Sequence, residues 1–233
     1  MKHILLLFWF AAVWMGCSPQ LGEGLRRKDV EKDVAIITDR GTMIIRLSDS
    51  TPLHRNNFVK LVKRHYYDGI LFHRVIQHFM IQAGDPNSKG AAVEKALGNG
   101  DLGYTIPAEF RPTLFHHKGV IAAAREGDLI NPQKASSATQ FYIVQGKIFN
   151  DAGLDSVETF KSGGRKIPAS QRKVYLTIGG TPHLDQNYTV FGAVIQGLAV
   201  IDSIAAVPVN PGIGNRPVED VKIIRARLIK RSD

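Results

Sequence analysis

The 233-residue sequence contains a single cysteine, Cys17, which lies close to the N-terminus. The rest of the chain therefore has no thiol for a disulfide, a thiolate metal site or nucleophilic catalysis. GxSxG and HExxH segments are also absent, which argues against the serine hydrolases and zinc proteases that depend on them. Catalysis through cysteine is therefore excluded for the rest of the chain.

Long hydrophobic runs are absent apart from residues 4–15, ILLLFWFAAVWM. This run is too short for a comfortable membrane span and follows a cationic start at residues 1–3, so it indicates an export signal. The Gly-Cys pair after it resembles the end of a bacterial lipobox and implies lipidation of Cys17. Trp14 stands where such boxes usually carry Leu, so plain secretion is the alternative. We expect residues 1–17 to direct export, and the protein to be lipid-anchored in the bacterial cell envelope, on the periplasmic side.

Positive charges exceed negative ones, with a formal net charge of +9. Such a surplus would suit a nucleic-acid partner. Apart from residues 26–28 and 222–231, however, the basic side chains are scattered among acidic ones. No alternation of aromatic and basic residues suggests a stacking platform for bases. We therefore expect no nucleic-acid partner.

The composition beyond the leader is that of one globular domain. Residues 18–33 are rich in Gly, Pro and charge, which is typical of a tether. We expect the domain at residues 34–230, with an insertion at about 146–180 that includes a short helix near residues 155–160. Short β-rich runs predict a hairpin over residues 34–47 and strands at 70–76, 79–83, 119–124, 139–144 and 221–228. Only residues 51–64 and 198–205 predict convincing helices.

Two further motifs carry little weight. Residues 98–103 satisfy GxGxxG, but no strand precedes them and a proline follows, so they lack the context of a dinucleotide site. His116 and His117 could ligate a metal, but adjacent residues on a strand point to opposite faces. We interpret this pair as exposed loop histidines.

The most informative stretch is residues 70–85, ILFHRVIQHFMIQAGD. A period of two places Arg74 in an apolar row, and it places Gln82 beside Met80. A guanidinium and an amide among apolar neighbours are unfavourable unless they are hydrogen-bonded. The spacing alone leaves two interpretations open, a snorkelling arginine with an edge glutamine or the polar groups of a ligand site. Strict alternation also puts Phe79 on the face opposite Met80.

FHRVI followed by FMIQAGD resembles the signature of the cyclophilin-type peptidyl-prolyl cis-trans isomerases. The resemblance implies that Arg74 and Gln82 are catalytic and that Phe79 and Met80 line a proline pocket. Residues 119–144 resemble a second block of that family and residues 179–192 a third. These two blocks imply the further substrate-binding residues Ala124, Gln140, Tyr142, His183, Leu184 and Tyr188.

The chain departs from the family pattern at several of these positions. Arg125 stands where the family commonly has Asn, and Tyr142 where it commonly has Phe. His183 occupies the place of a Trp that is associated with tight binding of the inhibitor cyclosporin, and Tyr188 the place of a His. These departures keep a second hypothesis open, a proline-peptide-binding or chaperone module with weak or no turnover.

The resemblance implies a mainly β fold, a closed eight-stranded antiparallel barrel capped by two helices. It implies an enzyme that accelerates rotation about X–Pro bonds during the folding of exported proteins, and this reaction requires no metal, no cofactor and no covalent step. Its partners would be proline-containing polypeptides, and it would act as a monomer.

Overall fold

The computed structural model describes residues 24–231, so the predicted export signal and Cys17 lie outside the described residues. In chain order the helices and strands are α1 (Arg27–Val30), β1 (Asp33–Thr38), β2 (Gly41–Leu47), α2 (Pro52–Lys63), β3 (Arg74–Ile76), β4 (Met80–Ala83), β5 (Thr105–Ile106), β6 (Val120–Ala123), β7 (Ser136–Ser137), β8 (Phe141–Val144), α3 (Asp151–Phe160), α4 (Ala169–Thr177), β9 (Val190–Gln196), α5 (Leu198–Ala205), β10 (Val209–Asn210), β11 (Arg216–Pro217) and β12 (Ile223–Ile229). Three 3-10 turns, η1 (Pro86–Ser88), η2 (Pro182–Leu184) and η3 (Pro211–Ile213), complete the described chain.

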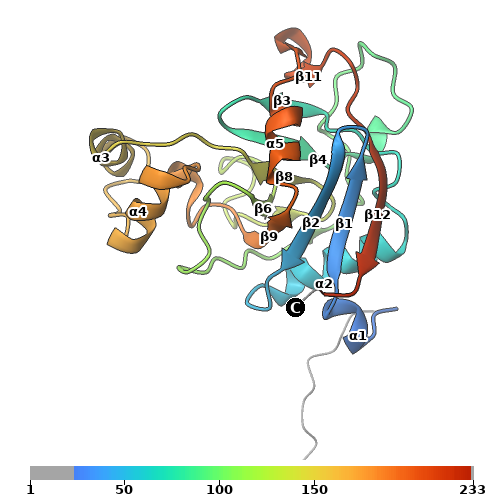
Figure 1. Cartoon of the computed structure of the whole chain (residues 1–233), viewed down its shortest axis with the longest axis horizontal. Helices are drawn as coiled ribbons and strands as arrows, with labels where there is room; N and C mark the ends of the chain where they lie inside the picture. Colours follow the sequence, from blue (N-terminus) through green and yellow to red (C-terminus); the bar gives the residue numbers. More distant parts are fainter. Residues whose placement is uncertain (1–23, 232–233) are drawn as a thin grey trace, which may run out of the picture.

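Eight strands form one strongly curled antiparallel sheet, in the order β12-β1-β2-β9-β6-β8-β4-β3 (Figure 1). The prediction of a closed barrel is wrong, because β12 and β3 are the two edges of this sheet and form no ladder with each other. The reason is the shortness of β3. The residues before it meet the start of β12 only through an isolated bridge between Leu71 and Lys222 and a few backbone hydrogen bonds.

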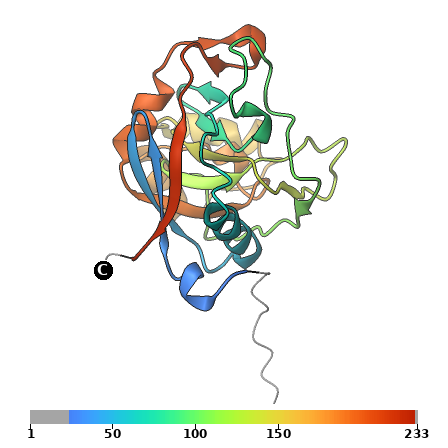
Figure 2. The ribbon, with the colours of Figure 1, turned by 90° about the vertical axis from the view of Figure 1, so that its right-hand side faces the viewer.

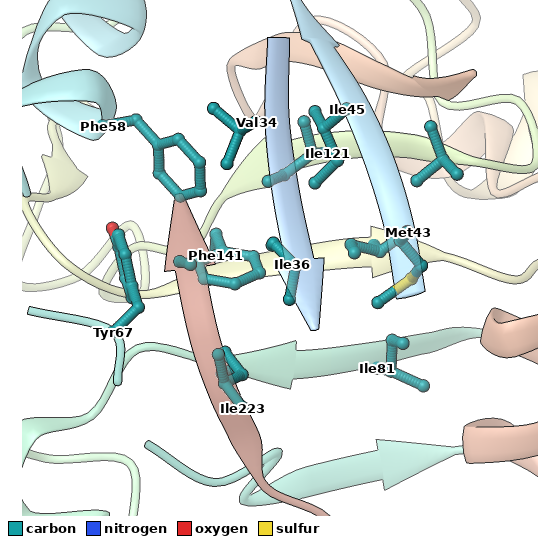
Figure 3. Close-up of a cluster of buried hydrophobic side chains, with 14 of the residues drawn as sticks. Val34, Ile36, Met43, Ile45, Phe58, Tyr67, Ile81, Ile121, Phe141 and Ile223 are labelled. Carbon is teal, nitrogen blue, oxygen red and sulfur yellow. The ribbon is translucent and has the colours of Figure 1, made fainter. Parts of the chain in front are cut away.

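The two faces of the curled sheet carry different side chains, because successive residues of a strand point to opposite sides. On β8, Phe141 and Ile143 enter the main core, whereas Tyr142 and Val144 belong to a second cluster on the other face. The main core fills the inside of the curl, as Figure 3 shows for residues of β1, β2, β4, β6, β8 and β12. The second cluster lies outside the curl and carries the candidate site.

Helices α2 and α5 pack on the main core, as predicted. Pro52 at the first turn favours the start of α2, and Phe58, Leu61 and Val62 on one face of the helix are buried in the core. Helix α5 buries Ile201 on the same core. Helix α3 lies where a short helix was expected near residues 155–160, whereas α1 and α4 are additional helices that were not expected.

Helix α1 falls within residues 18–33, the predicted tether. Asp29 and Val30 are buried, and Asp29 accepts a hydrogen bond of 2.7 Å from the ammonium group of Lys63 on α2. Figure 2 shows α1 next to α2, at the end of the sheet where β1 begins. The described part of this segment therefore packs on the domain.

Residues 146–180 leave and re-enter the sheet region at a single point. Gly146 and Gly180 lie so close that a Cβ added to Gly146 would stand 2.4 Å from the Cα of Gly180, and both have positive φ. Only glycine tolerates this contact in that conformation. Between these ends, α3 and α4 lie side by side, away from the sheet (Figure 1), around a small core of Leu154, Ile167 and Tyr175. Helix α4 was not predicted.

Candidate active site

A pocket of about 140 Å³ opens on the outer face of the sheet, where β3, β4, β6 and β8 meet the segment around η2. It contains every predicted site residue except Gln140 and His183. The lining residues are Arg74, Phe79, Met80, Gln82, Ala124, Arg125, Tyr142, Leu184 and Tyr188.

The hairpin of β3 and β4 places the two predicted catalytic side chains opposite each other. Arg74 pairs with Gln82 across the ladder, and directly opposed residues share a face. The guanidinium Nη1 of Arg74 donates to Oε1 of Gln82 at 3.1 Å. The Gln82 amide in turn donates to Oε1 of Gln140 at 3.1 Å. These hydrogen bonds explain why the guanidinium of Arg74 and the amide of Gln82 are tolerated among apolar neighbours.

The guanidinium of Arg74 retains unused donors. Within residues 24–231 its only hydrogen bond is the one to Gln82, and it forms no ion pair there. Burial lowers the pKa of Arg74 from its ordinary value, but a guanidinium stays protonated at any working pH. The pocket therefore presents a permanent cation whose remaining N–H groups can reach a ligand.

Phe79 enters the pocket from the hairpin turn, which resolves the conflict with strict alternation. It precedes the first residue of β4, and His78 before it has a φ of 63°. Its backbone amide donates to the carbonyl of Ile76 at 3.1 Å, which closes the turn. The ring thereby leaves the alternation of the strand and faces the same pocket as Met80.

Tyr142 forms the floor of the pocket and is only 4% exposed. Its hydroxyl lies 2.9 Å from Nε2 of His116, and Nδ1 of His116 lies 2.9 Å from Oδ1 of Asp185. Because a carboxylate only accepts, Nδ1 carries the proton and the Tyr142 hydroxyl donates to Nε2. The hydroxyl of Tyr175 on α4 donates to Oδ2 of Asp185 at 2.7 Å. Burial, and next Tyr188, raise the pKa of Tyr142 well above its ordinary value.

His116 is a residue that the sequence interpretation placed wrongly. It was expected to be an exposed loop histidine, but it is fully buried. Its partners Asp185 and Tyr142 are 69 and 26 residues away along the chain, so no local pattern indicates the contacts. The only signal was chemical, since a buried tyrosine in place of phenylalanine needs a partner for its hydroxyl.

Arg125 is a pocket residue outside the predicted set. Its guanidinium carbon lies 4.5 Å from the centre of the Tyr188 ring, a cation–π contact. Its Nε donates to the backbone carbonyl of Asn187 at 2.8 Å. The two departures from the family pattern at positions 125 and 188 therefore pack on each other.

Gln140 and His183 flank the pocket on different sides. Gln140 donates to the carbonyls of Gly98 and Gly100 at 2.8 and 2.9 Å and lines a neighbouring cavity of about 550 Å³. His183 stacks on the Phe79 ring, with centroids 5.7 Å apart, and lines a third cavity beyond it. Burial first, and then the nearby Lys161, lower the pKa of His183 to about 4.

Two negative findings concern the described residues 24–231 alone. They contain no cluster of three or more His, Cys, Asp or Glu side chains that could hold a metal ion. They also contain no helix with the length and apolar character that a membrane span requires. What the pocket offers is a group of apolar side chains, Phe79, Met80 and Leu184, beside a fixed cation, which suits a flat apolar group next to an amide.

Comparison with known proteins gives a consistent result. Residues 33–228 match the model of the family described as cyclophilin type peptidyl-prolyl cis-trans isomerase/CLD. A Staphylococcus haemolyticus protein named "Putative peptidyl-prolyl cis-trans isomerase" is 37% identical over 206 residues, covering 88% of this chain and 94% of that protein. A Staphylococcus aureus protein of the same name is 34% identical over 210 residues, covering 90% and 96%.

Solved structures show the same fold. A cyclophilin type peptidyl-prolyl cis-trans isomerase of Cryptosporidium parvum matches with a TM-score of 0.61 and 21% identity, covering 86% of this chain and 99% of that one. A second structure of it, in the presence of the dipeptide Ala-Pro, matches with a TM-score of 0.60.

Proposed function

Because this chain belongs to the cyclophilin-type peptidyl-prolyl cis-trans isomerases, we propose that Arg74 is its catalytic donor and that its substrates are proline-containing polypeptides in the course of export. Rotation about an X–Pro bond is slow because amide resonance imposes a barrier of roughly 18 to 20 kcal/mol. In the twisted state the resonance is lost, and the proline nitrogen carries a free lone pair. A donor aimed at this nitrogen binds the twisted amide better than either planar form, which is what catalysis requires.

One observation carries this proposal, namely the Arg74 cation beside the apolar side chains of the pocket. Gln82 holds this cation, and its other donors have no partner within residues 24–231. The walls of Phe79, Met80 and Leu184 suit a pyrrolidine ring. A differential stabilisation of about 5 kcal/mol would give almost four decades of rate. We propose that the enzyme acts as a monomer.

The substrates follow from two further considerations. The related protein of known structure was studied with the dipeptide Ala-Pro, which supports proline-containing polypeptides. The apolar run before Cys17 supports export, and the Gly-Cys pair supports a lipid anchor. We therefore place the enzyme on the periplasmic side of the bacterial cell envelope, where newly exported chains fold.

The test is isomerase turnover of a proline peptide by the wild type and by Arg74→Ala. We expect a loss of two or more decades in kcat/KM, because one charged hydrogen bond in a desolvated site stabilises a transition state by roughly 3 kcal/mol. Arg74→Lys should also be poor, since a compact ammonium cannot replace the planar fork. Arg40→Ala is the matched control, because within the described part of the chain the Arg40 side chain forms only a surface ion pair, with Glu219.

Circular dichroism should be unchanged in all three variants. Full activity of Arg74→Ala with an unchanged spectrum would contradict the assigned role of Arg74.

A further inference from the structure

The third cavity, beyond Phe79, is a groove of about 430 Å³ between the β3–β4 turn and the insertion at residues 146–180. We refer to it as the insertion groove. One wall comes from the hairpin turn, and the other from α3 and the segment that precedes it. The lining residues are His78, Phe79, Lys147, Ile148, Phe149, Asn150, Gly153, Ser156, Val157, Lys161, Gly180, Thr181 and His183.

The insertion groove and the proline pocket are neighbours that share one side chain. Phe79 lines both cavities. The ring of His183 stacks on it at 5.7 Å between centroids, so the two rings form the ridge between the cavities. An extended peptide rises about 3.3 Å per residue and therefore crosses such a ridge in roughly two residues. A polypeptide with its proline in the pocket can thus reach the groove.

The groove is positively charged. Its lining contains Lys147 and Lys161, and it contains no carboxylate. Among residues 24–231 neither lysine forms an ion pair with an acidic side chain. Lys147 lies over the ring of Phe149, with its ammonium 5.2 Å from the ring centre. Both lysines are exposed, so their charges are accessible to a ligand.

The acidic residues of α3 do not neutralise these lysines, because they face α4 instead. Asp151 and Asp155 pair with Arg172 of α4 at 2.7 and 3.0 Å. Glu158 pairs with Lys166 at 2.7 Å and with the same Arg172 at 3.0 Å. The insertion thus uses its carboxylates internally and leaves the face toward the proline pocket basic.

We propose that the insertion groove is an extended substrate site that binds an acidic side chain of the polypeptide, roughly two to four residues from the proline that occupies the pocket. This inference rests on the proposed function, since it names a class of substrate for the same site. Lys147 and Lys161 bind the carboxylate. Ile148 and Val157 supply apolar contact for its neighbours.

The experiment uses the full chain and a series of proline peptides in matched pairs. Each pair carries either Glu or Gln at one position, from three residues before the proline to four after it, and exchange NMR measures turnover without a coupling protease. The proteins compared are the wild type, the double variant Lys147→Gln/Lys161→Gln and the control Lys173→Gln. Lys173 is an exposed lysine on α4 that does not line the groove.

For the wild type we expect Glu to be favoured over Gln by about three- to ten-fold in kcat/KM, through KM, at one or two adjacent positions on one side of the proline. The ratio should fall to about one in the double variant and persist in Lys173→Gln. It should also fall at about 1 M salt, where the Debye length is only about 3 Å. Equal turnover of Glu and Gln at every position, or a preference that survives in the double variant, would overturn the proposal.

Failure of the groove and failure of the isomerase give different results. If no peptide is turned over, the proposed catalytic role fails, and titration of fluorescently labelled Glu and Gln peptides still decides whether the lysines select an acid. A lysine-dependent affinity for phosphatidylglycerol vesicles without any Glu preference would assign these lysines to a membrane surface. That result would overturn the peptide site.

Discussion

The hydrogen bond between Tyr175 and Asp185 provides the sharpest test of the buried network under the pocket. Both side chains are almost fully buried, at 0% and 1% exposure. The phenolic hydroxyl donates to Oδ2 of Asp185 at 2.7 Å. Burial, and next the Asp185 carboxylate, raise the pKa of Tyr175 well above its ordinary range, so the hydroxyl remains a donor at any working pH.

Tyr175→Phe removes this donor and keeps the ring, so the packing against Leu154 and Ile167 is retained. A hydrogen bond to a charged group contributes about 1.5 to 3 kcal/mol, and a buried carboxylate oxygen without a partner is unfavourable. We expect a loss of about 2 kcal/mol in the free energy of unfolding. For a domain of this size that corresponds to a decrease of roughly 4 to 8 °C in Tm.

Thermal and denaturant unfolding followed by circular dichroism would measure both quantities. The matched control is Tyr104→Phe, which also removes a phenolic hydroxyl, but one that donates an exposed hydrogen bond of 2.7 Å to Oδ1 of Asn57. A surface change of this kind should stay within about 0.5 kcal/mol. If Tyr175→Phe costs no more than Tyr104→Phe, the buried network does not stabilise the fold and the reasoning is refuted.

Three other predictions concern residues away from this network. Burial, above all, lowers the pKa of His73 from 6.5 to about 4. Between these two values the unfolded chain binds more protons than the folded one, so the free energy of unfolding falls as the pH falls through that window. His73→Phe should therefore lose less stability than the wild type between pH 7 and pH 4.5 in denaturant titrations, and an equal loss would contradict this. If Cys17 is lipidated, Cys17→Ala should move the protein from the membrane fraction to the soluble or unprocessed fraction, since acyl chains contribute about 0.8 kcal/mol per buried methylene; unchanged fractionation would exclude the anchor. His183→Trp should tighten cyclosporin binding by roughly ten-fold through the larger apolar face stacked near Phe79; equal affinities in a titration would show that position 183 does not contact the inhibitor.

Local patterns in the sequence were sufficient to predict most of the strands and the two helices on the main core. The hairpin of β3 and β4 followed from two short apolar runs, and alternation placed Arg74 in one apolar row and Gln82 beside Met80. The register that sets Arg74 opposite Gln82 is seen only in the structure. The position of Phe79 depends on the turn at His78, whose positive φ a period of two does not reveal. The closed barrel was wrong because closure depends on whether two distant edges have enough paired residues, and β3 has only three.

The insertion was harder to predict because its helices are stabilised by contacts distant in sequence. Helix α4 has no side-chain cap, and residues 169–177 show weak apolar periodicity. It is held by the burial of Tyr175 and by the ion pairs of Arg172 with α3. Tertiary packing of this kind overrides propensity, so a pattern within a single segment carries little information about it.

The insertion at residues 146–180 and the pocket are linked by hydrogen bonds that begin at the hydroxyl group of Tyr142. A phenylalanine at position 142 would need no partner, whereas the buried hydroxyl of Tyr142 must be hydrogen-bonded. His116 can accept from it only while its own Nδ1 proton is donated to Asp185, because one ring nitrogen of a neutral imidazole donates and the other accepts. The Asp185 carboxylate that fixes this tautomer is itself buried, and Tyr175 on α4 completes its hydrogen bonds. Each side chain in this series supplies the hydrogen bond that the previous one needs. A tyrosine in place of phenylalanine at position 142 therefore makes helix α4 a structural support of the site.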